Sequence, residues 1–264
     1  MTVAAYPIAL ALVLLLSLWL HPEFSQGAAF GIVGYNVQIA VDAKHHLIVE
    51  HEVTNVGSDR DQLSSMAEQA RAAIGTEKLS AIADRGYFKG TEILACDKAG
   101  ITVIVPKPNT SGAKADGRFG KDDFIYDAQN DQYRCPAGQR LIWRMTTQEQ
   151  DLILHRYWSS DCKNCAMKEK CTPGKERRIT RWEDEAVLEA MQSRLDHFPE
   201  AMRIRRQTAE HPFGTLKLWM GPAHFLMKTL KKVATEMSLH VLSYNLKRVM
   251  KILGIGPLMQ AIRA

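Results

Sequence analysis

Two acidic residues stand where a carboxylate could do chemistry, and Asp84 is the first of them. It directly follows the short apolar run 79–83 and precedes Gly86 by two residues. An aspartate at the carboxyl end of a sheet strand stands where open α/β sheets place their ligands. The alternative is a turn or a helix N-cap. The sequence therefore makes Asp84 a candidate metal ligand and leaves the cap open.

Glu210, the second acid, is surrounded by bases on a predicted helix. At 100° per residue, Glu210, Lys217 and Arg203 lie about 40°, 20° and 60° from Arg206 around the helix. A carboxylate ringed by cations on one helical face could hold a metal ion while the cations hold phosphates. A surface Arg206–Glu210 pair is the simpler alternative. Pro212 is expected to kink this helix, because it has no N–H to donate.

Basic residues are concentrated in the same part of the chain. Residues 203–251 contain ten basic and two acidic residues, whereas the whole chain contains 34 and 29. Such a block on predicted helices is typical of contact with DNA phosphates, and a solubilising helix surface is the alternative. The candidate DNA contacts are Arg203, Arg206, Lys217, Lys228, Lys231 and Lys232.

Four of the five cysteines lie within a short segment: Cys135, Cys162, Cys165 and Cys171. The Cys-x2-Cys step fits two thiolates that reach one tetrahedral zinc ion, which the other two could complete. The zinc would be structural, because four protein ligands leave no open position. Disulfides and free thiols are the other two interpretations.

The elements that must position these residues alternate between strands and helices. Period-two patterns predict strands over 35–42 and 47–53 with a short turn between them, hence an antiparallel hairpin with Asp42 in a turn role. Further strands are expected over 79–84 and 101–105, and helices up to about residue 74 and over 89–99. Asp59 and Asp61 are expected to cap the first of these helices. The pattern predicts an α/β protein with a mixed sheet and flanking helices.

The chain begins with a segment of different character, in which residues 1–22 carry no charge. It is predicted to form an apolar N-terminal helix, either a membrane segment through residues 3–20, a poor export signal or a stretch unrelated to the rest. The predicted organisation is this leader over 1–28, a first core part over 30–108, a small Cys-rich β insertion over 109–180 and a helical completion over 181–254. At 46% hydrophobic and 24% charged residues, the chain is neither disordered nor a coiled-coil rod.

From residue 34 to about 254 the sequence resembles the carboxyl-terminal catalytic part of bacterial insertion-sequence transposases of the DDE class. The resemblance rests on stretches such as GYNVQIAVD, ADRGYF, YRCPAGQ, the CKNC cluster and RRQTAEHPFGTLKLWMG. It implies a ribonuclease H-like core, with Asp84 as the second catalytic Asp and Glu210 as the catalytic Glu. The family's Tyr-x2-Arg-x3-Glu-x6-Lys signature falls on Arg203, Arg206, Glu210 and Lys217, with Arg203 in the Tyr position.

The activity that this resemblance implies is DNA strand nicking and joining in transposition. It implies Mg²⁺ or Mn²⁺ at the carboxylates, duplex DNA as partner, homo-oligomers and a cytoplasmic location. The first catalytic Asp should lie on a strand before residue 35, where the apolar leader stands. Asp42 is the alternative candidate for this role, against its expected turn role. The chain is therefore expected to be truncated at its amino end and catalytically impaired. The alternatives are a non-catalytic DNA-binding remnant or regulator and an exported or membrane-tethered protein.

Overall fold

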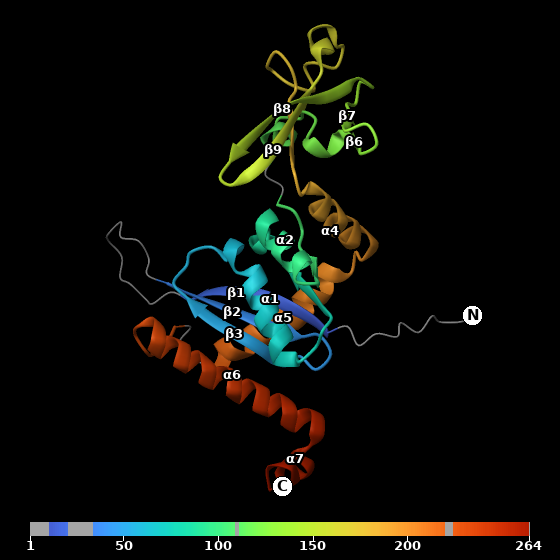
Figure 1. Cartoon of the computed structure of the whole chain (residues 1–264). Helices are drawn as coiled ribbons and strands as arrows, with labels where there is room; N and C mark the ends of the chain where they lie inside the picture. The colour runs from blue at the N-terminus through green and yellow to red at the C-terminus, as the bar shows by residue number, and fades with distance from the viewer. Residues whose placement is uncertain (1–10, 21–33, 109–110, 220–223, 264) are drawn as a thin grey trace, which may run out of the picture. The chain divides into compact units, whose positions relative to one another are not determined.

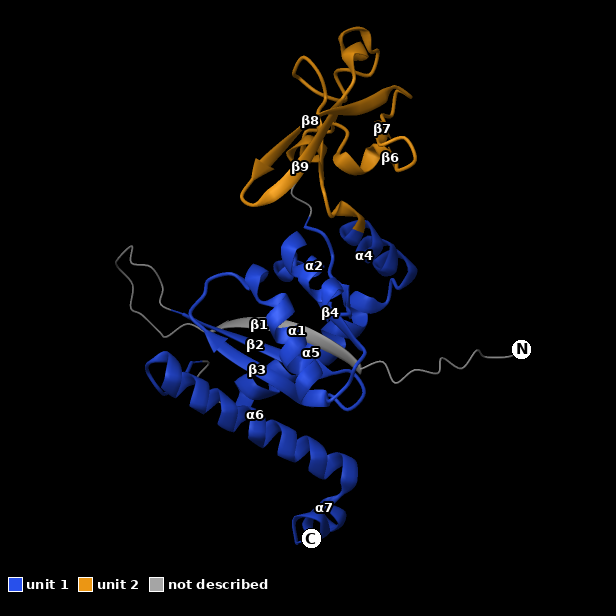
Figure 2. Ribbon diagram, in the orientation of Figure 1, with its two compact units in different colours: residues 1–108, 187–264 blue, residues 109–186 orange. Residues whose placement is uncertain are grey.

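Two five-stranded sheets organise the chain in the computed structural model, which describes residues 11–20, 34–108, 111–219 and 224–263 (Figure 1). They belong to two units, residues 1–108 with 187–264 (unit 1) and residues 109–186 (unit 2), which Figure 2 colours separately. The second unit coincides closely with the range of the predicted insertion, 109–180. The chain therefore leaves unit 1 after residue 108 and returns to it at residue 187.

The sheet of unit 1 has the strand order β3-β2-β1-β4-β5. Its central strand β1 pairs antiparallel with β2 and parallel with β4, and β4 pairs parallel with β5. The predicted hairpin and both later strands are confirmed. The strands are β1 (Ala11–Leu20), β2 (Tyr35–Asp42), β3 (Ile48–Thr54), β4 (Leu79–Ala83) and β5 (Ile101–Ile104).

The prediction of an apolar N-terminal helix is wrong for residues 11–20, which form the central strand β1. In the register of the sheet, Leu15 stands opposite Ala40 on β2 and opposite Ala83 on β4. A central strand in a sheet with helices over both faces is apolar at nearly every position, so its sequence lacks the alternation that identifies other strands. Residues 1–10 and 21–28 of the predicted leader lie outside the described residues. Among the helices that the structure describes, none has the length and apolar character needed to cross a membrane.

Helices cover both faces of this sheet. Alternate residues of β4 face opposite layers: Ala81 belongs to the cluster with α1 (Leu63–Ile74) and α2 (Gly90–Lys98), whereas Ile82 belongs to the cluster with α5 (Ala201–Trp219). Val37 and Ile39 of β2 pack against α5 and α6 (Leu230–Leu253). The remaining helices of this region are α4 (Glu185–His197) and α7 (Ile255–Arg263). The result is a sheet between two helical layers.

Helix α5 includes Pro212 and continues past it to Trp219. Pro212 is buried, as are Ala209 and Phe213 on either side of it. Packing of this apolar stripe against the sheet compensates for the backbone hydrogen bond that proline cannot make. The segment with the candidate residues Arg203, Glu210 and Lys217 is therefore a single helix.

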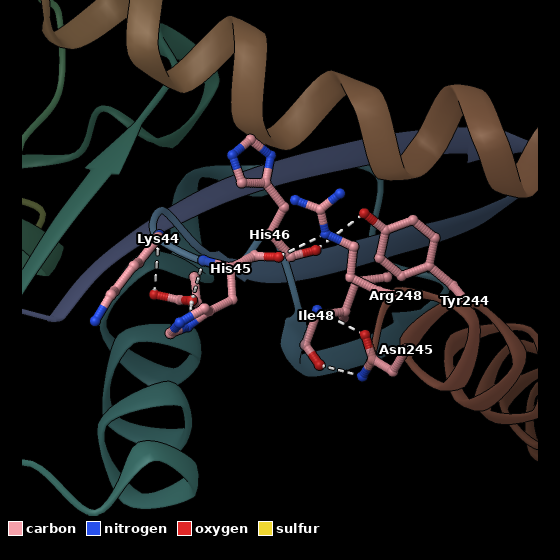
Figure 3. Close-up of polar contacts among 8 residues, drawn as sticks. Lys44, His45, His46, Ile48, Tyr244, Asn245 and Arg248 are labelled. Carbon is pink, nitrogen blue, oxygen red and sulfur yellow. Dashed lines mark hydrogen bonds and ion pairs between the residues drawn. The ribbon is translucent and has the colours of Figure 1, made fainter. Parts of the chain in front are cut away.

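Helix α6 is fastened to the β2–β3 hairpin by side chains that bond to its backbone (Figure 3). The amide of Asn245 accepts from the backbone N–H of Ile48 at 2.9 Å and donates to the carbonyl of Ile48 at 2.7 Å. One turn of the helix also supplies the Tyr244 hydroxyl to the His46 carbonyl at 2.9 Å and Arg248 Nε to the His45 carbonyl at 2.7 Å. These bonds fix the basic helix α6 on the sheet.

Unit 2 is built on an antiparallel sheet of order β10-β9-β8-β7-β6. Its core consists of few side chains: Phe124, Tyr133, Leu141, Tyr157 and Ile179. Asp131 accepts hydrogen bonds from the Tyr126 and Tyr157 hydroxyls at 2.8 and 2.6 Å. The elements are α3 (Gly112–Ala115), η3 (Lys121–Asp123), β6 (Ile125–Asp127), β7 (Gln132–Arg134), β8 (Arg140–Glu149), β9 (Leu152–Trp158), η4 (Ser160–Asn164) and β10 (Ile179–Trp182).

Candidate functional site

Asp84 lies at the carboxyl end of β4 and begins the short 3-10 helix η2 (Arg85–Tyr87). Its Oδ1 accepts a hydrogen bond from the backbone N–H of Gly86 at 2.8 Å. A Cβ atom on residue 86 would lie 2.9 Å from that oxygen, which explains the glycine there. The N-cap interpretation is therefore correct for one carboxylate oxygen, and the other remains available for a second partner.

Arg205 of α5 joins the two candidate carboxylates. Its Nη2 donates to Asp84 Oδ2 at 2.8 Å, and its Nη1 lies 3.5 Å from Glu210 Oε1. The Arg205 side chain is 9% exposed, whereas those of Asp84 and Glu210 are 34% and 50% exposed. A buried guanidinium thus holds together two partly solvated carboxylates that stand 126 positions apart in the sequence.

Sequence reasoning missed Arg205, although a signal for it was present. The buried residues of α5 include Ala201, Arg205, Thr208 and Pro212, which share one helical stripe. A charged residue in an apolar stripe indicates a buried partner, because an unpaired buried charge is costly. Glu210 pairs with this arginine rather than with Arg206 as the surface-pair alternative assumed.

Asp59 lies at the same edge of the sheet as Asp84. The Cβ position that is 2.9 Å from Asp84 Oδ1 is also 3.4 Å from Asp59 Oδ2. Asp59 Oδ1 accepts from Nδ2 of the buried Asn36 at 2.6 Å. The prediction that Asp59 and Asp61 cap the following helix is wrong: Asp61 pairs with Lys89, and both acids lie in a 3-10 turn, η1 (Asp59–Asp61), that precedes α1.

Asp42 lies at the opposite edge of the sheet and has the turn role that was expected of it. Its carboxylate accepts from the backbone N–H groups of Lys44 and His45 at 3.2 and 2.7 Å (Figure 3). In the register, Asp42 stands opposite Val13, near the start of β1, whereas Asp84 follows the end of the parallel strand β4. Asp42 is therefore not part of the site around Asp84.

The candidate DNA contacts divide into one paired and five unpaired cations. Arg203 forms an ion pair with Glu200 one turn earlier. The others are exposed, and within the described ranges none of them makes an ion pair. These exposed cations are Arg206, Lys217, Lys228, Lys231 and Lys232. Arg206 and Lys217 lie on α5, the helix that also carries Glu210.

The carboxylate site offers hard oxygen ligands, but few of them. In the part of the chain that the structure describes, no three side chains of the His, Cys, Asp or Glu type form a group that could hold a metal ion. Asp84 and Glu210 supply two carboxylates, and the neighbouring strand β1 contains no acidic residue. The arrangement therefore suits one cation shared by two carboxylates, a position that the Arg205 guanidinium takes here.

The four clustered cysteines line one small cavity of about 30 Å³ in unit 2. All are free thiols, and so is Cys96, which lies apart in the core of unit 1. Burial raises the pKa of the Cys171 thiol, Arg177 opposes this rise, and the thiols of Cys162, Cys135 and Cys165 add to it. The four cysteines thus line one cavity, and the disulfide interpretation finds no bonded pair among the described residues.

Comparison with known proteins gives a family match over part of the chain. Residues 134–250 match the family model described as a transposase DDE domain. A search among curated proteins found no match. Among solved structures, a cryo-EM structure of a piggyBac transposase synaptic complex with hairpin DNA is similar at 9% identity and a TM-score of 0.28. The alignment covers 96% of this chain and 56% of that chain.

The matched range includes Arg205, Glu210, the basic residues of α5 and those of α6 up to Arg248, and it begins after Asp84. Asp84 is thus connected with the matched part through its contact with Arg205. The resemblance to DDE transposases is confirmed over residues 134–250. This is the part of the chain that matches the transposase DDE domain.

Proposed function

We propose that the chain is a transposase-type protein that acts on duplex DNA, with Asp84 and Glu210 as two of the carboxylates of a phosphoryl-transfer site. The observation that carries this proposal is the Arg205 guanidinium, which lies 2.8 Å from Asp84 and 3.5 Å from Glu210. Arg205 brings Asp84 and Glu210 together from distant segments. The family resemblance implies a catalytic role for both acids, so this contact supports a common site. The match of residues 134–250 to a transposase DDE domain supports the class of reaction.

The topology of unit 1 agrees with a ribonuclease H-like core. An antiparallel hairpin at one edge, a central strand and two parallel crossover strands give the order β3-β2-β1-β4-β5. Asp84 follows β4, and Glu210 lies on a helix packed over the strand next to it. This arrangement directs both carboxylates to the carboxyl edge of the parallel strands, where open sheets bind ligands.

Asp84 and Glu210 would hold the Mg²⁺ or Mn²⁺ ion that the resemblance implies, because carboxylate oxygens suit hard cations. A divalent ion held there would stabilise developing charge on phosphoryl oxygens. Arg205 keeps the two carboxylates close when no cation lies between them, which lowers the cost of gathering like charges. Arg206 and Lys217 would bind DNA phosphates beside the carboxylates, and Lys228, Lys231 and Lys232 would extend that contact.

The activity of this chain is proposed to be weak, because β1 offers no third carboxylate. Loss of one carboxylate ligand from a catalytic metal site costs on the order of 10³-fold in rate. The five exposed cations favour a second candidate function, that of a DNA-binding protein without strand transfer. The two functions share a DNA surface and differ in whether Asp84 and Glu210 matter for cleavage.

Binding to a duplex at increasing salt tests the shared surface. The logarithm of affinity is expected to fall linearly with the logarithm of salt concentration, by about 0.9 for each phosphate contact. A triple variant, Lys228→Gln, Lys231→Gln and Lys232→Gln, should flatten the slope. The matched triple variant Lys44→Gln, Lys78→Gln and Lys98→Gln, at exposed lysines elsewhere in unit 1, should leave it unchanged. Equal slopes in all three proteins would contradict the proposed surface.

Plasmid nicking with Mn²⁺ or Mg²⁺ separates the two functions. Slow nicking that disappears in both Asp84→Asn and Glu210→Gln supports phosphoryl transfer at this site. Salt-dependent binding with no nicking by the wild-type chain supports the non-catalytic function. Nicking that survives both substitutions would assign the cleavage to something other than these carboxylates.

A further inference from the structure

The cavity that the clustered cysteines share lies among the loops of unit 2. Cys135 follows β7, Cys162 lies in η4, and Cys165 and Cys171 lie in the segment after it. The turn after β7 and the segment that begins with η4 are separated by β8 and β9, and the same cavity is lined by all four cysteines. At about 30 Å³ it has the volume of roughly one water molecule, which is suitable for a single ion.

Backbone turns place the cysteines at this cavity. The Cys135 carbonyl accepts from the N–H of Gly138 at 2.8 Å, in a turn that Gly138 closes with a φ of 78°. The Cys165 carbonyl accepts from Lys168 at 3.1 Å, and the N–H of Cys171 donates to the Lys168 carbonyl at 3.0 Å. Three of the four thiols are thus attached to tight turns, so their positions are set by the local backbone.

Arg177 gives an independent indication that the cavity receives a negative charge. Its side chain lines the same cavity and stacks over the Phe124 ring, with 5.5 Å from the guanidinium carbon to the ring centroid. Its Nε is buried, and within the described residues it has no hydrogen-bond acceptor. A buried donor without an acceptor is costly. A thiolate in the cavity would supply the acceptor, since sulfur bound to a metal accepts N–H hydrogen bonds.

We propose that Cys135, Cys162, Cys165 and Cys171 bind one structural zinc ion and that Arg177 offsets part of the negative charge of the centre. Binding transfers the proton of each thiol to solvent and forms four zinc–sulfur bonds, which leaves a centre of charge −2 beside the guanidinium. The thiols that line the cavity do not form a metal-holding group as they stand. A cysteine sulfur moves by rotation about one bond, so zinc can draw the four together while the turns stay in place.

We expect the zinc ion to stabilise unit 2, because the hydrophobic core of this unit is small. The unit spans residues 109–186, and its hydrophobic cluster consists of five buried side chains among the described residues, Phe124, Tyr133, Leu141, Tyr157 and Ile179. Domains below about 70–80 residues commonly need a metal or disulfides in addition to their hydrophobic core. The zinc would tie the turn after β7 to the segment between β9 and β10. This role does not depend on the proposed reaction at Asp84 and Glu210.

Metal content of the whole chain, purified under reducing conditions, tests the proposal. We expect one zinc per chain, and a marked loss in both Cys162→Ser and Cys165→Ser. Cys96→Ala is the matched control, since Cys96 lies in the core of unit 1, and it should keep the zinc. Zinc absent from the wild-type chain, or retained in both serine variants, would overturn the proposal.

Cobalt(II) provides a second measurement that does not depend on the stability of the variants. Added to the metal-free wild-type chain, it should give the absorption of tetrahedral thiolate coordination at one ion per chain, and zinc should displace it. Proteolysis within residues 109–186 should accelerate after a chelator and slow again after zinc. Four cysteines that pair as disulfides, or a cobalt complex without thiolate absorption, would overturn the proposal.

Discussion

Arg205 donates a hydrogen bond to Asp84 at 2.8 Å across 121 positions of sequence, and the same guanidinium lies 3.5 Å from Glu210. Helix α5 is thereby connected with the end of β4 by an ion pair at the place where the two candidate carboxylates converge. One buried arginine therefore has two consequences, one for the stability of unit 1 and one for the spacing of the site.

Replacement of Arg205 by Gln should lower the free energy of unfolding by about 1–2 kcal/mol. Removal of one partner from a hydrogen bond to a charged group costs about 1.5–3 kcal/mol, and the solvent exposure of Asp84 reduces that figure. Arg206→Gln is the matched control on the same helix, where an exposed side chain should change stability by less than about 0.5 kcal/mol. Urea unfolding of the three proteins measures this. Equal stability of Arg205→Gln and the wild type would show that the ion pair contributes nothing.

Introduction of an acid on β1 should increase the proposed nicking activity. The register pairs Leu15 with Ala83, so the next position, Leu16, stands beside Asp84. Leu16→Asp is expected to raise metal-dependent plasmid nicking about tenfold or more, which corresponds to about 1.4 kcal/mol of transition-state stabilisation. Leu16→Asn is the control, because it has the same shape without the charge. Equal rates in the two variants, both folded by circular dichroism, would argue against a missing third carboxylate.

Acidification should destabilise unit 1 through His46. Burial lowers the pKa of His46 below 6.5, and the charges of Arg248 and His211 lower it further, against the opposing effect of Asp42. As the pH falls through 6.5, the unfolded chain takes up the proton before the folded chain does. Stability contributed by neutral His46 is therefore present at neutral pH and is lost as the pH falls toward the folded pKa.

The variant His46→Asn checks this effect, because asparagine tolerates the left-handed backbone of residue 46, where φ is 58°. Urea unfolding at about pH 7.5 and about pH 5.5 should show a smaller loss of stability in the variant than in the wild type. His155→Asn, in unit 2, should keep the wild-type difference. A pH difference that is the same in all three proteins would remove His46 as the cause.

Loss of the Tyr157 hydroxyl should loosen unit 2. It donates to Asp131 Oδ1 at 2.6 Å from a side chain that is almost fully buried. Tyr157→Phe should cost about 1 kcal/mol, the usual net value of a hydrogen bond. Tyr126→Phe removes the 2.8 Å bond to the same oxygen and should cost less, because Tyr126 is more exposed. Hydrogen exchange across residues 125–158 would report faster exchange in Tyr157→Phe, and an unchanged rate would contradict this role.

The sequence predicted much of unit 1 because its signals there are local. The alternation in residues 35–42 reflects a strand with two differently packed faces, and Gly100 ends the helix before β5 in the left-handed conformation that favours glycine. The apolar residues 11–20 were misread as a helix for the opposite reason. A strand covered on both faces has no polar side to reveal its period.

The candidate site was predicted only in part. Asp84 and Glu210 were predicted because each stands at a recognisable position, the end of a strand and a basic helical face. Arg205 was missed because its contact with Asp84 depends on how α5 packs over β4, which no local pattern contains. Asp59 was assigned as a cap, and its contact with Asn36 likewise depends on the packing of distant segments.

The attachment of α6 to the hairpin also hinders association between copies of this chain. Strand β3 is the edge of the sheet of unit 1, and free backbone groups on an edge invite another chain to add a strand. The amide of Asn245 occupies both the N–H and the carbonyl of Ile48, so it imitates one residue of a neighbouring strand. Because α6 already bonds to both backbone groups of Ile48, a strand from another chain cannot pair with this residue. Aggregation through this edge is blocked at Ile48.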